Sequence, residues 1–257
     1  MLLKKKNLYK LIILILIILL LVVITYQQDD SDFNLDSKPI FNTDQNNSDD
    51  SNKAKEINQI ETNQIDYENT INDLKEKYNN EEIVGILSFN DRDIMLPVAQ
   101  TIDNEYYLYH AYDKSEDIKG AIYLDYRVKI DTSKKLLIYG HSSSKSEFPF
   151  NFLQNYHEEE YYTSNKNVDL ITSTGIKHYE IFSVFVETSD FSYMNINFES
   201  DEDYLSHINK LKEKSMYDTD IKLAEDDEIL IIQTCSTNEK YKDYENKYLL
   251  IILKRKE

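Results

Sequence analysis

Two predicted strand ends in this sequence carry the residues that thiol chemistry requires. Cys235 follows the apolar run 229–232 and the polar pair 233–234, so it lies where a buried strand reaches solvent. His141 follows the apolar run 136–139 in the same way. An imidazole beside a thiol can keep the thiol ionised and can later protonate a leaving amine. The pair predicts nucleophilic thiol catalysis.

Each of these residues also has an ordinary structural interpretation. A buried cysteine is commonly core filler, and a single histidine at a strand end is commonly a surface residue. The other histidines (His110, His157, His178 and His207) lie in helical, loop or strand-start contexts without the same placement. With one cysteine in the chain, an intramolecular disulfide and a zinc site built from two or four cysteines are both excluded.

The composition limits the class of protein. The chain has 257 residues, with 29 basic against 47 acidic side chains and a net charge of −18, which disfavours nucleic acid as a partner. At 41% hydrophobic residues it can bury a core. Its 21 tyrosines against 4 glycines indicate a β-rich domain with few glycine turns.

Short apolar runs of strand type begin at residue 83. A polar amphipathic stretch at 201–214, acidic at its start and lysine-rich at its end, is typical of a helix. Many short strands with one inserted helix predict a mostly β, α+β domain built on a closed or nearly closed eight-stranded barrel. The predicted strands are 83–88, 94–99, 120–125, 135–140, 168–172, 178–186, 228–234 and 247–253.

The N-terminus has the pattern of a membrane anchor. Residues 11–24 are all Leu, Ile or Val, and with its flanks the segment 8–26 reaches about 28 Å as a helix. No small-residue cleavage site follows it, so we expect an uncleaved anchor. Lysines precede the segment and aspartates follow it, which predicts a cytoplasmic N-terminus and an extracellular domain in the cell membrane.

Three regions follow from these patterns. Residues 1–26 form the basic stub and the anchor, and residues 27–53 form a flexible acidic linker. Residues 54–257 form the domain, beginning with one or two amphipathic helices over 54–78.

At the two strand ends the sequence resembles the class B sortases, transpeptidases of Gram-positive cell surfaces. The resemblance covers about 82–253 and rests on Tyr-Gly-His at 139–141, Thr-Cys at 234–235 and the anchor. The segments 103–108 (Asp-Asn-Glu-Tyr-Tyr-Leu) and 120–125 (Gly-Ala-Ile-Tyr-Leu-Asp) resemble two further motifs of this class. The stretch 198–215 is similar to the long helix that class B places before the cysteine strand.

The resemblance implies a mechanism, partners and a binding surface. Cys235 would attack the carbonyl after the threonine of a C-terminal sorting signal on a secreted protein, and His141 would protonate the departing amine. An amine of the peptidoglycan would resolve the thioester, the Ser236 N–H would donate to the oxyanion, and no metal or cofactor is needed. The family's pattern would place the substrate-binding residues at Asn104, Leu108, Ser189, Tyr193, Met194, Gln233 and Ser236.

Two positions depart from the family pattern. Gln233 stands where the family usually has serine, and Lys247 stands where it has an essential arginine at the start of the last strand. Lysine keeps the positive charge but loses the planar fork that holds two acceptors. We therefore expect a weak transpeptidase in which Lys247 takes the arginine's place. The alternatives are a degenerate sortase-like domain that binds peptide with little turnover, and a cysteine hydrolase with water as acceptor.

Overall fold

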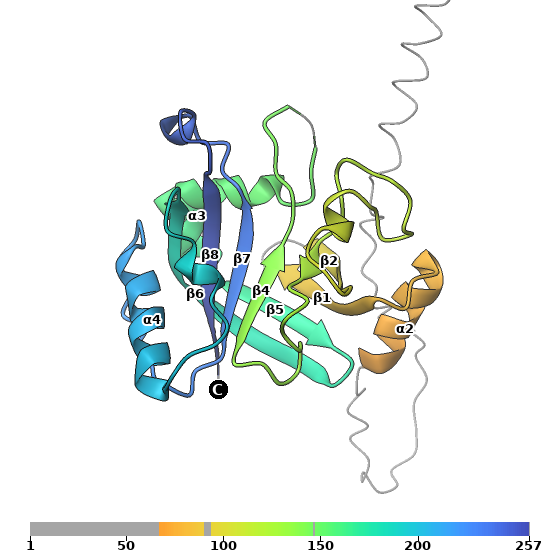
Figure 1. Cartoon of the computed structure of the whole chain (residues 1–257), viewed down its shortest axis with the longest axis horizontal. Coiled ribbons are helices and arrows are strands. Elements are labelled where there is room, and N and C mark those ends of the chain that lie inside the picture. Colours follow the sequence, from red (N-terminus) through yellow and green to blue (C-terminus); the bar gives the residue numbers. More distant parts are fainter. Residues whose placement is uncertain (1–66, 90–93, 146, 257) are drawn as a thin grey trace, which may run out of the picture. The chain divides into compact units, whose positions relative to one another are not determined.

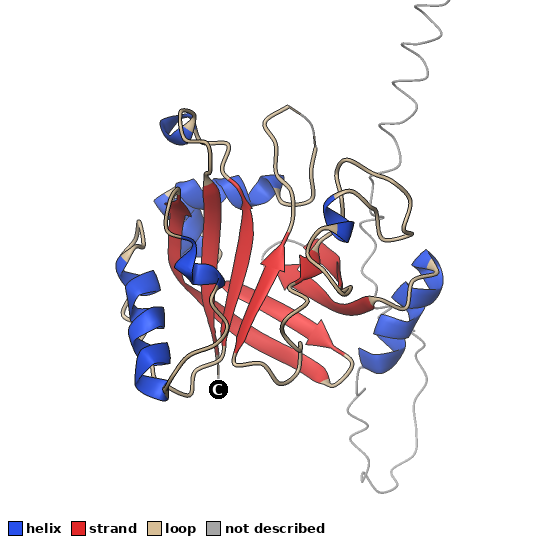
Figure 2. Cartoon of the chain, viewed as in Figure 1, coloured by secondary structure: helices blue, strands red, loops and turns tan. Residues whose placement is uncertain are grey.

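The computed structural model describes residues 67–89, 94–145 and 147–256, and eight strands form a closed barrel among them (Figures 1 and 2). The strand order around the barrel is β1-β2-β3-β4-β7-β8-β6-β5. This confirms the predicted eight-stranded barrel with added helices. The strands are β1 (Ile83–Phe89), β2 (Ile94–Ala99), β3 (Tyr123–Leu124), β4 (Lys135–Tyr139), β5 (Asn167–Thr172), β6 (Gly175–Glu187), β7 (Ile229–Cys235) and β8 (Tyr248–Arg255).

The predicted anchor, the acidic linker and the start of the predicted helices lie in residues 1–66, outside the described residues. Within the part of the chain that the structure does describe, no helix is long and apolar enough to span a bilayer.

Strands β4 and β7 form a parallel pair in the barrel, between β3 and β8. Every residue of β4 is buried, and β7 is buried from Ile229 to Ile232. Parallel strands covered on both faces are apolar along their whole length, which explains why these two segments are runs of Leu and Ile rather than alternating patterns. Their register runs from Lys135 opposite Ile229 to Tyr139 opposite Gln233.

One strand is much shorter than the prediction of 120–125. Gly120 adopts a positive φ of 61°, and a Cβ at this position would lie 2.5 Å from the carbonyl oxygen of Tyr107. The Ala121 N–H donates to that same oxygen, so residues 120–121 pack against the segment around Tyr107 and pair with no strand. Only Tyr123 and Leu124 remain in β3.

Helices cover the barrel from outside (Figure 1). The helix α4 (Asp201–Glu213) confirms the predicted helix at 201–214; the Ser200 side chain caps it by accepting from the Asp203 N–H, and its buried face includes Tyr204 and Leu211. The helix α2 (Tyr67–Tyr78) packs on β1 and β5. The other helical segments are α3 (Glu159–Ser164) and the 3-10 helices η2 (Tyr106–Leu108), η3 (Asn151–His157), η4 (Phe191–Met194) and η5 (Glu239–Tyr241).

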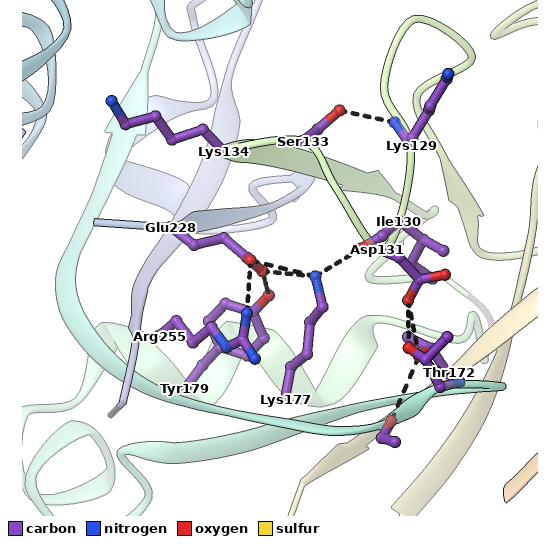
Figure 3. A network of polar contacts seen from close by, with 12 residues as sticks. Lys129, Ile130, Asp131, Ser133, Lys134, Thr172, Lys177, Tyr179, Glu228 and Arg255 are labelled. Atoms are coloured by element: carbon purple, nitrogen blue, oxygen red, sulfur yellow. Dashed lines mark hydrogen bonds and ion pairs between the residues drawn. The ribbon is translucent and has the colours of Figure 1, made fainter. Parts of the chain in front are cut away.

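A network of charged side chains lies at the end of the barrel where β7 begins (Figure 3). Glu228 accepts from Lys177 Nζ at 3.0 and 3.2 Å, from Arg255 Nη1 at 3.0 Å and from the Tyr179 hydroxyl. Lys177 Nζ also donates to the Ile130 carbonyl at 2.7 Å. The Lys177 and Glu228 side chains are 6% and 14% exposed, so this ion pair is largely withdrawn from water.

Candidate active site

The two predicted chemical residues lie at neighbouring strand ends. Cys235 is the last residue of β7, and His141 lies two residues beyond the end of β4. The parallel register brings Tyr139 opposite Gln233, and the Gly140 N–H donates to the Gln233 carbonyl at 3.2 Å. Two more residues along each strand reach His141 and Cys235, so the fold places the histidine and cysteine segments side by side.

A backbone carbonyl orients the His141 imidazole. The His141 Nε2 lies 2.9 Å from the carbonyl oxygen of Leu108, in the segment between β2 and β3. Because a carbonyl oxygen only accepts, Nε2 carries the proton in the neutral ring. The Nδ1 atom is then the nitrogen that remains to take up and deliver a proton.

Opposing effects act on the Cys235 thiol. Cys235 remains accessible to solvent, but the surrounding protein desolvates the thiolate, and this burial raises the pKa of the thiol. The positive charge of Lys247 acts in the other direction and lowers the pKa. Lys247 directly precedes Tyr248, the residue paired with Cys235 across β7 and β8, and its Nζ donates to the carbonyl oxygen of Lys242 at 3.2 Å.

The Ser236 N–H, the predicted oxyanion donor, has a backbone partner in the folded chain. It donates to the carbonyl oxygen of Lys247 at 2.7 Å. The antiparallel pairing of β7 and β8 continues one residue beyond Cys235 and Tyr248, and this extra backbone hydrogen bond occupies the amide. This N–H is therefore bonded within the sheet, and its role as an oxyanion donor stays a prediction.

Comparison with known proteins identifies the family. No family model matches the chain. Over 175 residues it is 31% identical to sortase B of Listeria monocytogenes, a match covering 67% of this chain and 69% of that protein. The chain belongs to the sortase B family.

Solved sortase B structures share the fold. The crystal structure of Clostridium perfringens sortase B matches with a TM-score of 0.65 and 26% identity, over 72% of this chain and 99% of that one. A Staphylococcus aureus sortase B–substrate complex matches with a TM-score of 0.65 over 74% of this chain and 86% of that one. At 24% identity, the latter shows a common fold alone.

Two of the predicted substrate-binding residues of this sortase lie together at the cysteine. The Tyr193 hydroxyl donates to Gln233 Oε1 at 2.8 Å, and Gln233 lies two residues before Cys235. Tyr193 is buried, and both its burial and the nearby Cys235 raise the pKa of its phenol. Gln233, one of the departures from the family pattern, therefore forms part of the wall next to the thiol.

The other predicted substrate-binding residues have different surroundings. Leu108 contacts the site through its carbonyl, which holds His141. Asn104 donates to Asp125 Oδ2 at 3.0 Å and accepts from the Tyr126 N–H, so its side chain is used within the fold. Met194, whose carbonyl accepts from Arg127, and the exposed Ser189 lie on the segment between β6 and α4.

The helix η3 contributes two further residues to the site that no sequence pattern indicates. Gln154 hydrogen-bonds to both the histidine and the cysteine segments, and His157 Nε2 lies 3.3 Å from the Ser236 hydroxyl. The sequence groups His157 with the histidines that lack a strand-end placement, yet the fold places it beside the residue after Cys235. These partners are far apart in the chain, and the segment 151–157 carries no recognisable motif, so only the tertiary structure reveals them.

A buried lysine holds the segment that carries Tyr193. Lys135 Nζ donates to the carbonyl oxygens of Tyr193 at 2.7 Å and Asn195 at 2.6 Å, and it lies 2.8 Å from His207 Nε2. Burial, together with the charge of Arg127, lowers the pKa of Lys135 to about 7. Burial and the charge of Lys135 lower the pKa of His207 to about 4.

This lysine makes stability depend on pH. Between about pH 7 and about pH 9.5, the unfolded chain holds a proton on Lys135 that the folded chain has released, so stability should rise with pH. We expect the free energy of unfolding to increase by roughly 1 kcal/mol per pH unit relative to Lys135→Met, and to flatten below pH 7. Urea unfolding across this range measures the difference. Parallel curves for the two proteins would contradict the assignment.

Proposed function

We propose that this chain is a membrane-anchored transpeptidase that joins secreted proteins to the cell wall. The observation that carries the proposal is the placement of Cys235 and His141, each two residues beyond the last paired residues Gln233 and Tyr139 of β7 and β4, in a chain of the sortase B family. The substrate is a secreted protein with a C-terminal sorting signal, and the acceptor is an amine of the peptidoglycan. Residues 8–26 anchor the enzyme in the membrane with its domain outside.

The first half-reaction acylates the cysteine. The Cys235 thiolate attacks the carbonyl carbon after the threonine of the sorting signal, and a carbon–sulfur bond forms. Protonated at Nδ1, His141 donates that proton to the departing amine as the carbon–nitrogen bond breaks. The Leu108 carbonyl holds the ring through Nε2, which keeps Nδ1 free for this transfer.

The second half-reaction releases the product. The acceptor amine attacks the thioester carbonyl and loses a proton to His141 Nδ1, and the carbon–sulfur bond breaks to restore the thiolate. Lys247 supplies positive charge beside the sulfur in both steps. A lysine makes one point-like contact where an arginine makes a forked one, so we expect modest turnover.

The test is a covalent adduct on Cys235. Cells carrying the full chain are given sorting-signal peptides and an acceptor amine from outside, and mass spectrometry follows the peptide on the protein. We expect an adduct in the wild type and none in Cys235→Ala. Lys247→Arg should raise turnover about tenfold, and Lys247→Gln should lower it, because the thiolate loses its nearby cation.

The outcomes separate this proposal from its competitors. An adduct that resolves only to the free acid, even with excess amine, would indicate a hydrolase. No adduct with any peptide in the wild type or in Lys247→Arg would indicate a peptide-binding domain without turnover. An adduct in isolated membranes opened by detergent, but not on intact cells, would contradict the proposed orientation.

A further inference from the structure

The backbone ladder that joins the histidine and cysteine strands ends before either residue. The pairing of β4 with β7 stops at Tyr139 and Gln233, and the last backbone hydrogen bond runs from Gly140 to Gln233. Among the described residues, no backbone hydrogen bond joins residues 141–149, which follow β4, to residues 234–238 at the end of β7. Something other than the ladder must set the spacing of the two reactive side chains.

One side-chain amide crosses that gap. Gln154 Nε2 donates one hydrogen to the Cys235 carbonyl at 3.0 Å and the other to the Ser142 hydroxyl at 3.1 Å. Its Oε1 accepts from the Thr237 N–H at 2.9 Å. Both amide hydrogens and the amide oxygen are used, so a single planar group fixes the residue after His141, Cys235 itself, and the turn that follows the cysteine.

The helix that carries Gln154 is itself held on the histidine side. The Phe150 N–H, just before η3, donates to the His141 carbonyl at 3.1 Å. Asn151 Oδ1 accepts from the Ser143 N–H at 2.8 Å. The neighbouring Leu153 is fully buried, which prevents the helix from tilting. These contacts fix the helix η3 to the His141 segment, and Gln154 connects the helix to the end of the cysteine strand. The longer His157–Ser236 contact at 3.3 Å is a second, weaker connection.

From this arrangement we infer that Gln154 is a positioning residue that sets the separation of the Cys235 thiol and the His141 imidazole. The inference rests on the proposed function, because it assigns the spacing of that function's nucleophile and acid. Proton transfer requires the two groups in near-attack geometry, and a displacement of about 1 Å can cost on the order of 100-fold in rate. The hydrogen bonds of Gln154 reach the Cys235 carbonyl, the Thr237 N–H and the Ser142 hydroxyl and not the sulfur, so its effect acts through the backbone.

Two substitutions isolate this role. Gln154→Met keeps the length of the side chain but removes all three hydrogen bonds. Gln154→Glu keeps the acceptor for Thr237, loses the donors, and places a carboxylate against the Cys235 carbonyl oxygen. Asn155→Asp is the matched control, because it makes the same amide-to-carboxylate change on the exposed neighbouring residue of η3.

The first measurement needs no sorting peptide. The rate at which iodoacetamide alkylates Cys235, the chain's single cysteine, is followed against pH in the full-length protein. We expect the half-maximal pH to shift in both Gln154 variants, because Cys235 is no longer held in the surroundings whose burial and Lys247 charge set the pKa of its thiol. In Asn155→Asp it should stay at the wild-type value. Thermal unfolding midpoints should stay within about 3 °C of wild type in all three variants.

The second measurement is peptide turnover. We expect Gln154→Met to lower kcat about 30-fold with KM within about twofold, because positioning affects the reaction step and not peptide binding. A wild-type alkylation profile and kcat in Gln154→Met would overturn the inference. If the wild type makes no adduct, the proposed function fails, whereas a shifted alkylation profile still supports the positioning role. If Gln154→Met does not fold, Ser142→Ala, which removes the hydrogen bonds of the Ser142 hydroxyl to Gln154 and Asn151 and leaves those to Cys235 and Thr237, should give a smaller shift in the same direction. The absence of that shift would refute the role.

Discussion

Replacing His141 with glutamine is expected to lower kcat for peptide transfer about a thousandfold. A glutamine side chain can still donate to the Leu108 carbonyl, which holds the His141 Nε2 at 2.9 Å, but it cannot carry a titrating proton. The substitution therefore removes proton transfer while leaving the local contact possible. General acid–base catalysis contributes about 100- to 10,000-fold, and the leaving amine of an amide depends on it strongly.

The measurement is steady-state turnover of a sorting-signal peptide across pH. In the wild type, one limb of the pH profile should report the imidazole, and in His141→Gln that limb should disappear. His178→Gln is the control, because His178 is an exposed histidine at the far end of the barrel, paired with Asp169 at 2.8 Å. Turnover by His141→Gln within tenfold of wild type would show that another group supplies the proton.

The second large effect concerns stability. Glu228→Gln is expected to lower the free energy of unfolding by about 3–5 kcal/mol, because the change leaves the buried Lys177 ammonium without its counter-charge. The carboxylate accepts from Lys177, Arg255 and Tyr179 (Figure 3). The amide keeps one acceptor oxygen but carries no charge, so the Lys177 ammonium, which also donates to the Ile130 carbonyl, loses its counter-charge. Urea unfolding of the full chain measures the difference.

Two further variants make this prediction specific. Glu81→Gln removes a carboxylate that is 90% exposed and lies 3.5 Å from Lys75, and we expect it to cost less than about 1 kcal/mol. The double variant Lys177→Met with Glu228→Leu should recover much of the loss, since no uncompensated charge remains. Equal losses in Glu228→Gln and Glu81→Gln would contradict the role assigned to burial.

The stability effect should leave the chemistry of the folded enzyme unchanged. Glu228 directly precedes β7, and Cys235 ends that strand, so about 23 Å of extended chain separates them at roughly 3.3 Å per residue. Turnover per folded molecule in Glu228→Gln should therefore match wild type at temperatures where both are folded. Such a result would show that the Glu228 network affects the stability of the barrel and not the chemistry of the site at its other end.

Much of the local structure was predictable because it depends on short-range patterns. Short apolar runs rich in Ile such as 229–232 are typical of buried strands, and the change to polar residues at Gln233 marks the place where β7 reaches solvent. The helix α4 was predictable from its apolar spacing and acidic first turn. The placement of Cys235 and His141 at strand ends follows from the same reasoning, which is why the chemistry could be named before the fold.

The tertiary structure alone decided which segments meet. That β4 lies parallel to β7 is set by closure of the barrel, and it brings His141 to Cys235 across about ninety intervening residues. Gln154 hydrogen-bonds to Cys235 over 81 residues, and Lys177 pairs with Glu228 over 51, at positions whose neighbours in sequence carry no matching pattern. The Ser236 N–H is occupied because β8 extends the ladder past the cysteine. Hydrophobic periodicity encodes which face of an element is buried, but a long-range partner depends on how all the elements pack together, and no local pattern records it.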